Sequence, residues 1–436
     1  MTHYKKNLLL RIDWLTLLLY LILVGIGITA VYSSEYSSLN QEFWDFSRSH
    51  TKQLTWLGIS LFVGLLILLT DSKFFYSVSY LVYVLGIILL LLTFVLGGSV
   101  KGSNSFIQIG GFSFQPGEIV KVSTTLALAR FIATPELDYS LWKNRIISMV
   151  IAFLPCIIII LQNETGLALV YFSFILVMFR EGLPSGILIF GIASIALMIS
   201  TLLVEAIPLL IIITAIAILV SFLNRKALRN NKIFFVFVGI AWFVAVMFSQ
   251  VIVPFVFKNV FHGYQVERIY TMFGQDVPSE YLKPGSTPSQ DAEYNVRQAK
   301  IAIGSGGLFG KGFMNGTHTK YSFVPEQHTD FVFCGIGEQF GFIGSSLLVL
   351  FFVLLLLRII HLAERQRSTF SRVYAYSVAS ILFFHFAINL SMTMGLAPVI
   401  GITLPMLSYG GTSLLSFSIF LFILVRLDAD REVLIR

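Results

Sequence analysis

The chain has 436 residues, of which 56% are hydrophobic and only 12% are charged, and its formal net charge is +7. Because soluble chains carry roughly 25% charged residues, this composition excludes a set of water-soluble domains, and the high aromatic content excludes a disordered chain. The mean hydropathy of +0.83 indicates a polytopic membrane protein. The expected fold class is all-α, because in lipid a helix satisfies its own backbone and no barrel alternation is visible.

Apolar runs that suit membrane-spanning helices recur from one end of the chain to the other. About twelve can be distinguished near the length that a bilayer requires, although several are short. They lie at residues 14–33, 53–70, 74–97, 118–133, 146–162, 167–180, 184–204, 206–223, 233–257, 332–357, 373–395 and 406–426. The first run is too long for a signal-peptide core and lacks a small-residue cleavage site, so we expect a retained anchor.

The positive charges indicate how these runs cross the membrane. If the N-terminus is cytoplasmic, an even number of spans returns the C-terminus to the cytoplasm. Most of the 30 lysines and arginines then fall in short cytoplasmic loops. This is the distribution that the positive-inside rule describes, so the charge surplus needs no nucleic-acid partner.

Two hydrophilic segments fall on the outer side in this orientation. Residues 98–117 are rich in Gly and Ser, and residues 258–331 form a long hydrophilic loop. Loops of that length are usually functional or disordered. Within the long loop, residues 276–294 are expected to be flexible, whereas residues 297–331 are expected to be ordered and to lie along the membrane. The whole chain, 1–436, is interpreted as a single membrane domain that contains this loop.

Ionisable residues inside apolar runs are candidate functional groups, because charge is costly in a bilayer. Glu118 and Lys121 are three residues apart at the outer end of one run, so they share a helix face and can pair. Two interpretations stay open for them. One is a structural ion pair that caps the helix, and the other is a cationic phosphate site in which Glu118 orients Lys121.

The segment at 325–331 gathers ionisable residues where the long outer loop meets an apolar run. Its sequence is PEQHTDF, with Glu326, His328 and Asp330 converging and Thr329 able to cap the following helix. One interpretation is helix capping with a solvated carboxylate. The other is a reaction on a phosphate-bearing lipid, with a carboxylate as general base and nearby lysines, Lys311 and Lys320, stabilising a departing pyrophosphate.

The remaining ionisable residues in or near the runs are interpreted as structural. We expect Glu164 to pack against outer loops, Glu205 to lie in a turn, and His385 to be a satisfied core histidine. Glu338, two helical turns after Asp330, is expected to be a buried partner. Cys156 and Cys334 lack metal-ligand or disulfide spacing and are expected to be buried apolar residues. The Gly-rich run 304–316 lacks the spacing of a nucleotide loop.

Four segments together resemble the SEDS family, the RodA and FtsW proteins of bacterial wall synthesis. Residues 298–344, which include GSGGLFGKGF and PEQHTDF, are similar to the family's signature. FQPGE at 114–118, LQNETGLALV at 161–170 and PVIGITLPMLSYGGTS at 398–413 resemble its other motifs in the same order. The opening RIDW at 11–14 is more similar to the RodA branch than to the FtsW branch, which favours elongation over division.

The resemblance implies a peptidoglycan glycosyltransferase that polymerises lipid II and releases undecaprenyl pyrophosphate in an inverting displacement. It would act at the outer face of the bacterial cytoplasmic (inner) membrane in cell wall biogenesis and cell shape. The implied partners are a class B penicillin-binding transpeptidase and other membrane proteins of the elongation complex. A divalent cation, Mg²⁺ or Mn²⁺, is expected to assist the reaction, and no organic cofactor is expected.

The resemblance also assigns candidate residues. The family's presumed catalytic aspartate corresponds to Asp330, and Glu118 and Lys121 correspond to residues of the active-site cavity. The motif positions at Gln298, Lys311 and His328 have no assigned chemistry and are carried over as candidate substrate-binding residues.

The sequence departs from the family pattern in several places, including the number of spans and Glu164, and three other functions stay open. The family usually has ten spans, so the extra pair is expected within 184–257, and Glu164 replaces an aspartate. The alternatives are a lipid II flippase, an FtsW-like division polymerase and a non-catalytic scaffold. A flippase needs a polar path across the bilayer midplane, whereas the candidate groups cluster at the outer face.

Overall fold

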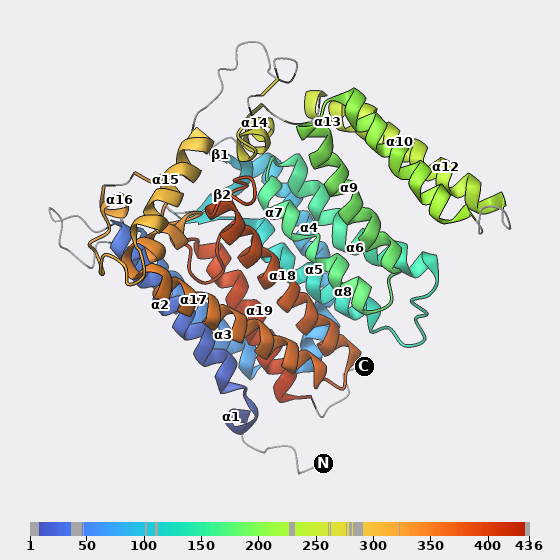
Figure 1. Ribbon diagram of the computed structural model, residues 1–436. Coiled ribbons are helices and arrows are strands. Elements are labelled where there is room, and N and C mark those ends of the chain that lie inside the picture. The colour runs from blue at the N-terminus through green and yellow to red at the C-terminus, as the bar shows by residue number, and fades with distance from the viewer. Residues whose placement is uncertain are drawn as a thin grey trace. The chain divides into compact units, whose positions relative to one another are not determined.

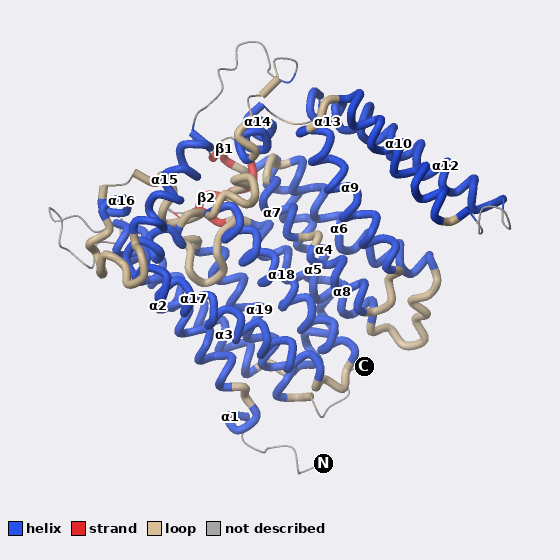
Figure 2. The backbone as a smooth tube through the Cα atoms, in the orientation of Figure 1, coloured by secondary structure: helices blue, strands red, loops and turns tan. Residues whose placement is uncertain are grey.

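The computed structural model describes residues 8–35, 46, 48–100, 103–109, 112–225, 232–259, 261, 263–275, 277–278, 281, 291–321 and 323–431. The chain forms two compact units, and each is described by itself. The first comprises Met1–Leu183 with Asn295–Arg436, and the second comprises Pro184–Tyr294. Figures 1 and 2 show that helices make up most of both units.

The first unit is a helical bundle built around three buried helices. Its helices are α1 (Leu8–Arg11), α2 (Trp14–Glu35), α3 (Ser49–Leu69), α4 (Ser72–Leu96), α5 (Pro116–Ile132), α6 (Trp142–Leu161), α7 (Thr165–Val170), α8 (Ser173–Arg180), most of α15 (Asp291–Ser305), α16 (Thr317–Lys320), α17 (Val332–Glu364), α18 (Thr369–Thr393) and α19 (Gly411–Ala429). Helices α5, α18 and α19 are buried along most of their length. Helix α19 lies against α3, α5 and α18, whereas α17 lies against α2 and α18.

The second unit contains the apolar helices that follow residue 184. They are α9 (Ser185–Leu203), α10 (Ala206–Leu223), α12 (Lys232–Met247), the π-helix η1 (Phe248–Ile252), α13 (Val253–Asn259) and α14 (Gly263–Met272). Val253 and Phe257 of α13 pack with Val266 and Tyr270 of α14 in the core of this unit. Glu205 lies in the turn between α9 and α10, as the sequence predicts.

A small antiparallel sheet covers one end of the first unit. Its strands are β1 (Gly98–Val100), β2 (Ser103–Ile109) and β3 (Phe112–Phe114), in that order across the sheet. Strand β2 contacts α4 and α5, and β3 contacts α19. The sheet and α16 lie at one end of the unit, whereas α1 meets the far end of α19 (Figure 1).

The all-α polytopic class is confirmed, and the number of long spans differs from the expected count. Among the described residues, 10 helices are long and apolar enough to cross a membrane. The other two expected runs are also helical, but they are shorter. Helix α5 has 17 residues, and Thr165–Arg180 is divided between α7 and α8. The last expected run was placed at 406–426, whereas the corresponding helix α19 starts at Gly411.

The region 184–257 is helical, the extra pair expected there stays a prediction, and the long loop is partly helical. Within 184–257 the chain forms α9, α10 and the α12–α13 segment. Within 258–331 the described residues include α14, α15 and α16. Of the stretch expected to be flexible, residues 276, 279–280 and 282–290 lie outside the described residues. The placement of 297–331 along the membrane and the single-domain interpretation stay predictions.

Helix α17 is interrupted at Gly341, and the Gly-rich loop at 304–316 forms hydrogen bonds with the backbone on both sides of the interruption. Gly341 has φ 64° and ψ −159°, which is outside the helical region. Four backbone hydrogen bonds join the loop to the two sides of the break: Lys311 N to Glu338 O (3.0 Å), Gly312 N to Gln339 O (3.0 Å), Phe342 N to Gly307 O (2.8 Å) and Ile343 N to Leu308 O (3.1 Å). Unpaired backbone groups are costly in a membrane, so this pairing stabilises the broken helix.

The close approach of the loop to α17 explains its glycines. A Cβ atom on Gly306 would lie 2.1 Å from the carbonyl oxygen of Gly337, and one on Gly310 would lie 2.1 Å from that of Gln339. Neither contact is possible for a larger residue without moving the backbone. The run 304–316 is therefore an ordered packing element.

Candidate active site

Asp330 lies in a tight turn immediately before α17. The carbonyl of Glu326, a residue with φ 53°, accepts hydrogen bonds from the amides of Thr329 (3.1 Å) and Asp330 (3.2 Å). The Thr329 hydroxyl donates to the Glu326 carboxylate at 3.1 Å. The prediction that Thr329 caps α17 is therefore wrong: the N-cap residue is Phe331, and the hydroxyl is satisfied inside the turn.

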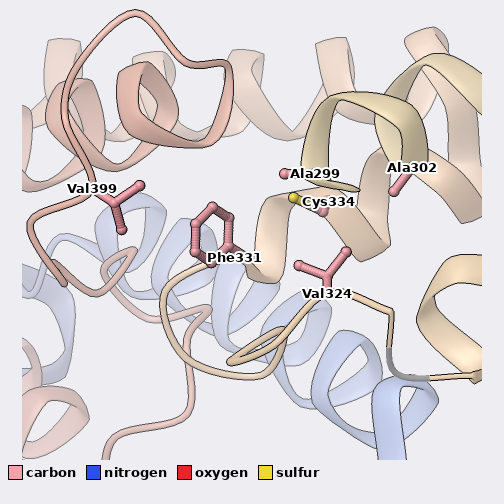
Figure 3. Packing of buried hydrophobic residues seen from close by; sticks show 6 residues of the cluster. All are labelled: Ala299, Ala302, Val324, Phe331, Cys334 and Val399. Carbon is pink, nitrogen blue, oxygen red and sulfur yellow. The ribbon is translucent and has the colours of Figure 1, made fainter. Parts of the chain in front are cut away.

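Side chains on both sides of Asp330 anchor this turn. The amide of Gln327 donates to the carbonyls of Ser34 (3.0 Å) and Thr319 (3.1 Å). Phe331 is buried in a small apolar core beside Ala299 of α15 and Val399 (Figure 3). These contacts hold the turn from α2, α15 and the loop at 394–410.

The 394–410 loop also borders the Asp330 side chain. Asn389 of α18 donates to the carbonyl of Asp330 at 2.9 Å and to that of Ile402 at 2.6 Å. A Cβ atom on Gly401 would lie 3.4 Å from Oδ2 of Asp330, so the carboxylate faces the backbone of this loop. Asp330 is half-buried, which leaves part of the residue accessible to a substrate.

His328 lies close to Asp330 in the same turn and contacts a tyrosine. Its carbonyl accepts from the amide of Tyr409 at 2.8 Å, and the two rings are 6.0 Å apart. Burial raises the pKa of Tyr409, and the negative charge of Glu35 raises it further. The Glu35 carboxylate caps α3 by accepting from the amides of Ser49 and His50, and it contacts the His50 ring at 3.1 Å.

Glu35, His50 and Tyr409 were not predicted as site residues, although Tyr409 lies in the family-like segment at 398–413. The available signals were a carboxylate at the end of the first span and a histidine at the start of the second. Glu35 and His50 are not unusual at those positions. Only the fold brings them near the turn that carries Asp330.

Glu118 and Lys121 form the predicted pair on α5. The Lys121 Nζ lies 2.8 Å from the Glu118 carboxylate, and both side chains are almost fully buried. The Lys121 Nζ also lies 2.8 Å from Nε2 of His385 and 4.9 Å from the centroid of the Phe417 ring. The ammonium is 0% exposed, so a substrate reaches it only if one of its present partners moves.

His385 is satisfied in the core, as the sequence predicts. Its Nδ1 lies 3.2 Å from the carbonyl oxygen of Thr403. Because a carbonyl oxygen only accepts, the hydrogen lies on Nδ1, and Nε2 accepts from Lys121. Thr403, Ile402 and Gly401 are consecutive, so one short segment links His385 of α18 to the Asp330 carboxylate.

Lys311 is engaged by a buried carboxylate away from Asp330. Its Nζ lies 2.8 Å from Glu338, whose side chain is 0% exposed. Glu338 also accepts from the amides of His318 (2.9 Å) and Thr319 (2.9 Å) and from the Thr319 hydroxyl (2.6 Å). Glu338 is thus buried as predicted, and its partners are Lys311 and the α16 turn.

The other candidates lie at the same end of the first unit. Gln298 is half-buried on α15, one residue before Ala299 of the Phe331 core, and Lys320 is exposed at the end of α16. The Glu164 carboxylate accepts from the Ser105 hydroxyl of β2 at 2.6 Å, as expected for packing against an outer loop. Cys156 and Cys334 are both buried and unpaired with each other.

The described residues offer no resident metal site. Among them, no group of three or more His, Cys, Asp or Glu side chains could hold a metal ion. The expected divalent cation therefore stays a prediction, and no step of the chemistry is assigned to it.

Comparison with known proteins places this geometry in a family. The profile of the FtsW/RodA/SpoVE cell cycle proteins matches residues 13–236 and 209–433. The chain belongs to this family. The two matches overlap across part of α10 and the start of α12. Such an overlap is expected if this region contains an insertion that has no counterpart in the family profile.

Three relatives illustrate the similarity. The peptidoglycan glycosyltransferase RodA of Treponema pallidum is 31% identical over 96% of this chain and 97% of its own length. The peptidoglycan glycosyltransferase MrdB of Escherichia coli K12 is 31% identical over 81% of this chain and 78% of its own. The probable peptidoglycan glycosyltransferase FtsW of Buchnera aphidicola is 28% identical over 98% and 94%.

Two solved structures share the fold. A chain of a peptidoglycan synthase complex matches with a TM-score of 0.67 at 23% identity, over 96% of this chain and 98% of that chain. RodA of Thermus thermophilus matches with a TM-score of 0.60 at 22% identity, over 97% and 98%. The fold and the family relationship together define a multi-pass bacterial membrane protein of the SEDS type, most similar to the RodA branch.

Proposed function

We propose that this chain is a peptidoglycan glycosyltransferase that polymerises lipid II into glycan strands during cell elongation. The observation that carries the proposal is the setting of Asp330. Asp330 is half-buried and lies in a turn anchored by three parts of the first unit. Its carboxylate faces the 394–410 loop. Two relatives that are 31% identical over 96% and 81% of this chain are named peptidoglycan glycosyltransferases, which supports the same activity.

Asp330 acts in this proposal as the general base. The 4-hydroxyl oxygen of the acceptor GlcNAc attacks the anomeric carbon of the donor MurNAc. The bond from that carbon to the pyrophosphate breaks, and undecaprenyl pyrophosphate leaves with the electron pair. The hydroxyl proton passes to the Asp330 carboxylate. A single displacement inverts the α-linked donor to the β-linked product, so one base is sufficient.

Lys121 and Glu118 are proposed to serve the donor side. A cation beside the departing pyrophosphate stabilises the developing negative charge. Because the Lys121 ammonium is buried between Glu118 and His385, donor binding must displace a partner before direct contact. Lys311, His328 and Gln298 are proposed to contribute to the rim of the substrate site, with Lys311 held by Glu338.

The orientation and the partners follow from the same proposal. Both termini are cytoplasmic, and the end of the first unit that carries the sheet, α16 and Asp330 faces outward in the cytoplasmic membrane. This agrees with the positive-inside distribution of the short loops. The partner is a class B penicillin-binding transpeptidase with other elongation-complex proteins. A structural relative is part of a complex that coordinates polymerization and crosslinking, which supports this partner.

A reconstituted assay tests the proposed function. The full chain, alone and with its cognate transpeptidase, is incubated with labelled lipid II, and the products are separated beside those of Asp330→Asn. We expect a ladder of glycan polymers that the variant abolishes. Translocation of lipid II across vesicles without any polymer would instead support the flippase. A ladder of full intensity from Asp330→Asn would remove the base role.

A further inference from the structure

Two residues of α18 contact the two groups on which the proposed chemistry depends. His385 and Asn389 are four residues apart and therefore lie on one face of the helix. His385 contacts Lys121 through Nε2 at 2.8 Å, and Asn389 donates to the Asp330 carbonyl at 2.9 Å. Both side chains are almost fully buried, at 1% and 0% exposed.

The same two residues also hold one segment of the 394–410 loop. His385 Nδ1 donates to the Thr403 carbonyl at 3.2 Å, and Asn389 donates to the Ile402 carbonyl at 2.6 Å. The next residue towards the N-terminus, Gly401, faces the Asp330 carboxylate. Thr403 is linked to α19 as well, through its hydroxyl and that of Ser413 at 3.1 Å.

We propose that His385 and Asn389 form a clamp on α18 that sets the separation between Lys121 and Asp330. This inference rests on the proposed function, in which Lys121 serves donor binding and Asp330 serves the chemical step. The two residues are positioning residues: His385 acts through Lys121, and Asn389 acts through the backbone of Asp330. A helix is suited to this role, because its residues keep a fixed spacing in a close-packed interior.

The clamp predicts different kinetic effects at its two ends. When the donor sugar displaces Glu118 from Lys121, His385 stays bound to the ammonium and keeps it in place. His385→Leu therefore raises KM for lipid II more than it lowers kcat. Asn389→Leu removes the hydrogen bond to the Asp330 carbonyl and displaces the catalytic base. It should therefore lower kcat with little change in KM. The hydrogen bond between His385 and Lys121 involves a charged group, which suggests an effect of about tenfold or more. The bond from Asn389 to the Asp330 carbonyl joins neutral groups, which suggests about two- to tenfold.

Two conservative variants of His385 separate its two hydrogen bonds. In His385→Gln the amide lies near the position of Nε2 and retains an acceptor for Lys121. In His385→Asn the amide lies near the position of Nδ1 and retains a donor to Thr403. We expect KM for lipid II to stay close to the wild-type value in His385→Gln, whereas His385→Asn should show the raised KM of His385→Leu.

The experiment measures steady-state polymerisation of lipid II by the full chain with its partner, together with the melting temperature of each variant. Ser377→Ala is the matched control, because Ser377 is buried on α18 and donates only to its own helix at Val373. Parallel losses of kcat and stability in all α18 variants, without rescue by His385→Gln, would overturn the clamp. Loss of activity in Asp330→Asn with unchanged kinetics in both Leu variants would remove the clamp and leave the proposed function.

Discussion

The carboxylate of Glu338 is the feature whose removal has the most clearly defined consequence. It is fully buried and accepts hydrogen bonds from Lys311, from the backbone amides of His318 and Thr319, and from the Thr319 hydroxyl. Glu338→Gln removes the charge and turns one oxygen into a donor, so at least two buried donors lose their acceptor. Each unsatisfied donor costs about 1–3 kcal/mol, and breaking a buried ion pair costs about 3–5 kcal/mol.

The expected effect is local, because these donors belong to the loop at 306–321. We predict that its opening free energy falls by about 3–5 kcal/mol, which raises amide exchange in the loop by roughly two to four powers of ten. Hydrogen–deuterium exchange of the full chain in nanodiscs measures this directly. Glu164→Gln is the control, because the carboxylate of Glu164 accepts one hydrogen bond, from the Ser105 hydroxyl on strand β2. Equal exchange at 306–321 in wild type and Glu338→Gln would refute the reasoning.

Three further predictions concern the glycines, the buried Asp13 and the metal. Gly310→Ala should prevent folding, because its Cβ would lie 2.1 Å from the Gln339 carbonyl oxygen. Gly304→Ala should be tolerated, because its Cβ would have no neighbouring atom within 4 Å. The yield of monodisperse protein in detergent compares the two variants. Burial raises the pKa of Asp13, but hydrogen bonds from Arg358 and Thr16 lower it more. Its folded pKa is thus below its unfolded pKa, so its contribution to stability is present above about pH 4 and is lost as the pH falls further; melting curves should show an acid loss that Asp13→Asn reduces. Chelation with EDTA should slow polymerisation, with recovery on adding Mg²⁺ or Mn²⁺, whereas unchanged rates would exclude the expected cation.

Local spacing allowed part of the site to be predicted from the sequence. The pairing of Glu118 with Lys121 follows from their three-residue separation on a helix. The burial of Cys156, Cys334 and Glu338 follows from their positions in or beside apolar runs. The helical class follows from the composition, because a chain with so few charges must satisfy its backbone within the membrane.

The rest depends on contacts between distant parts of the chain. Lys121 and His385 are 264 residues apart in sequence, and no local pattern predicts that they meet. The sequence also gives no sign that the Gly-rich loop returns to pair with the break at Gly341. The late start of α19 has a similar cause, because the Tyr409 amide is bound by the His328 carbonyl and Met406 adopts φ 67°.

The short strands were missed because their sequence is typical of a loop. Residues 98–114 are rich in Gly and Ser, and each of the outer strands has only 3 residues. Their pairing is supported by contacts of the sheet with α4, α5 and α19. Tertiary context, which a single sequence does not contain, therefore decides the structure of this segment.

The central claim is that Asp330 performs the chemical step, and its most direct test separates binding from catalysis. Lipid II binding and single-turnover polymerisation are measured on the same preparations of wild type, Asp330→Asn and Asp330→Glu. The account predicts that Asp330→Asn binds lipid II within a few-fold of wild type and forms no glycosidic bond, while Asp330→Glu retains some activity because it keeps a carboxylate. Bond formation by Asp330→Asn at the wild-type rate would contradict it.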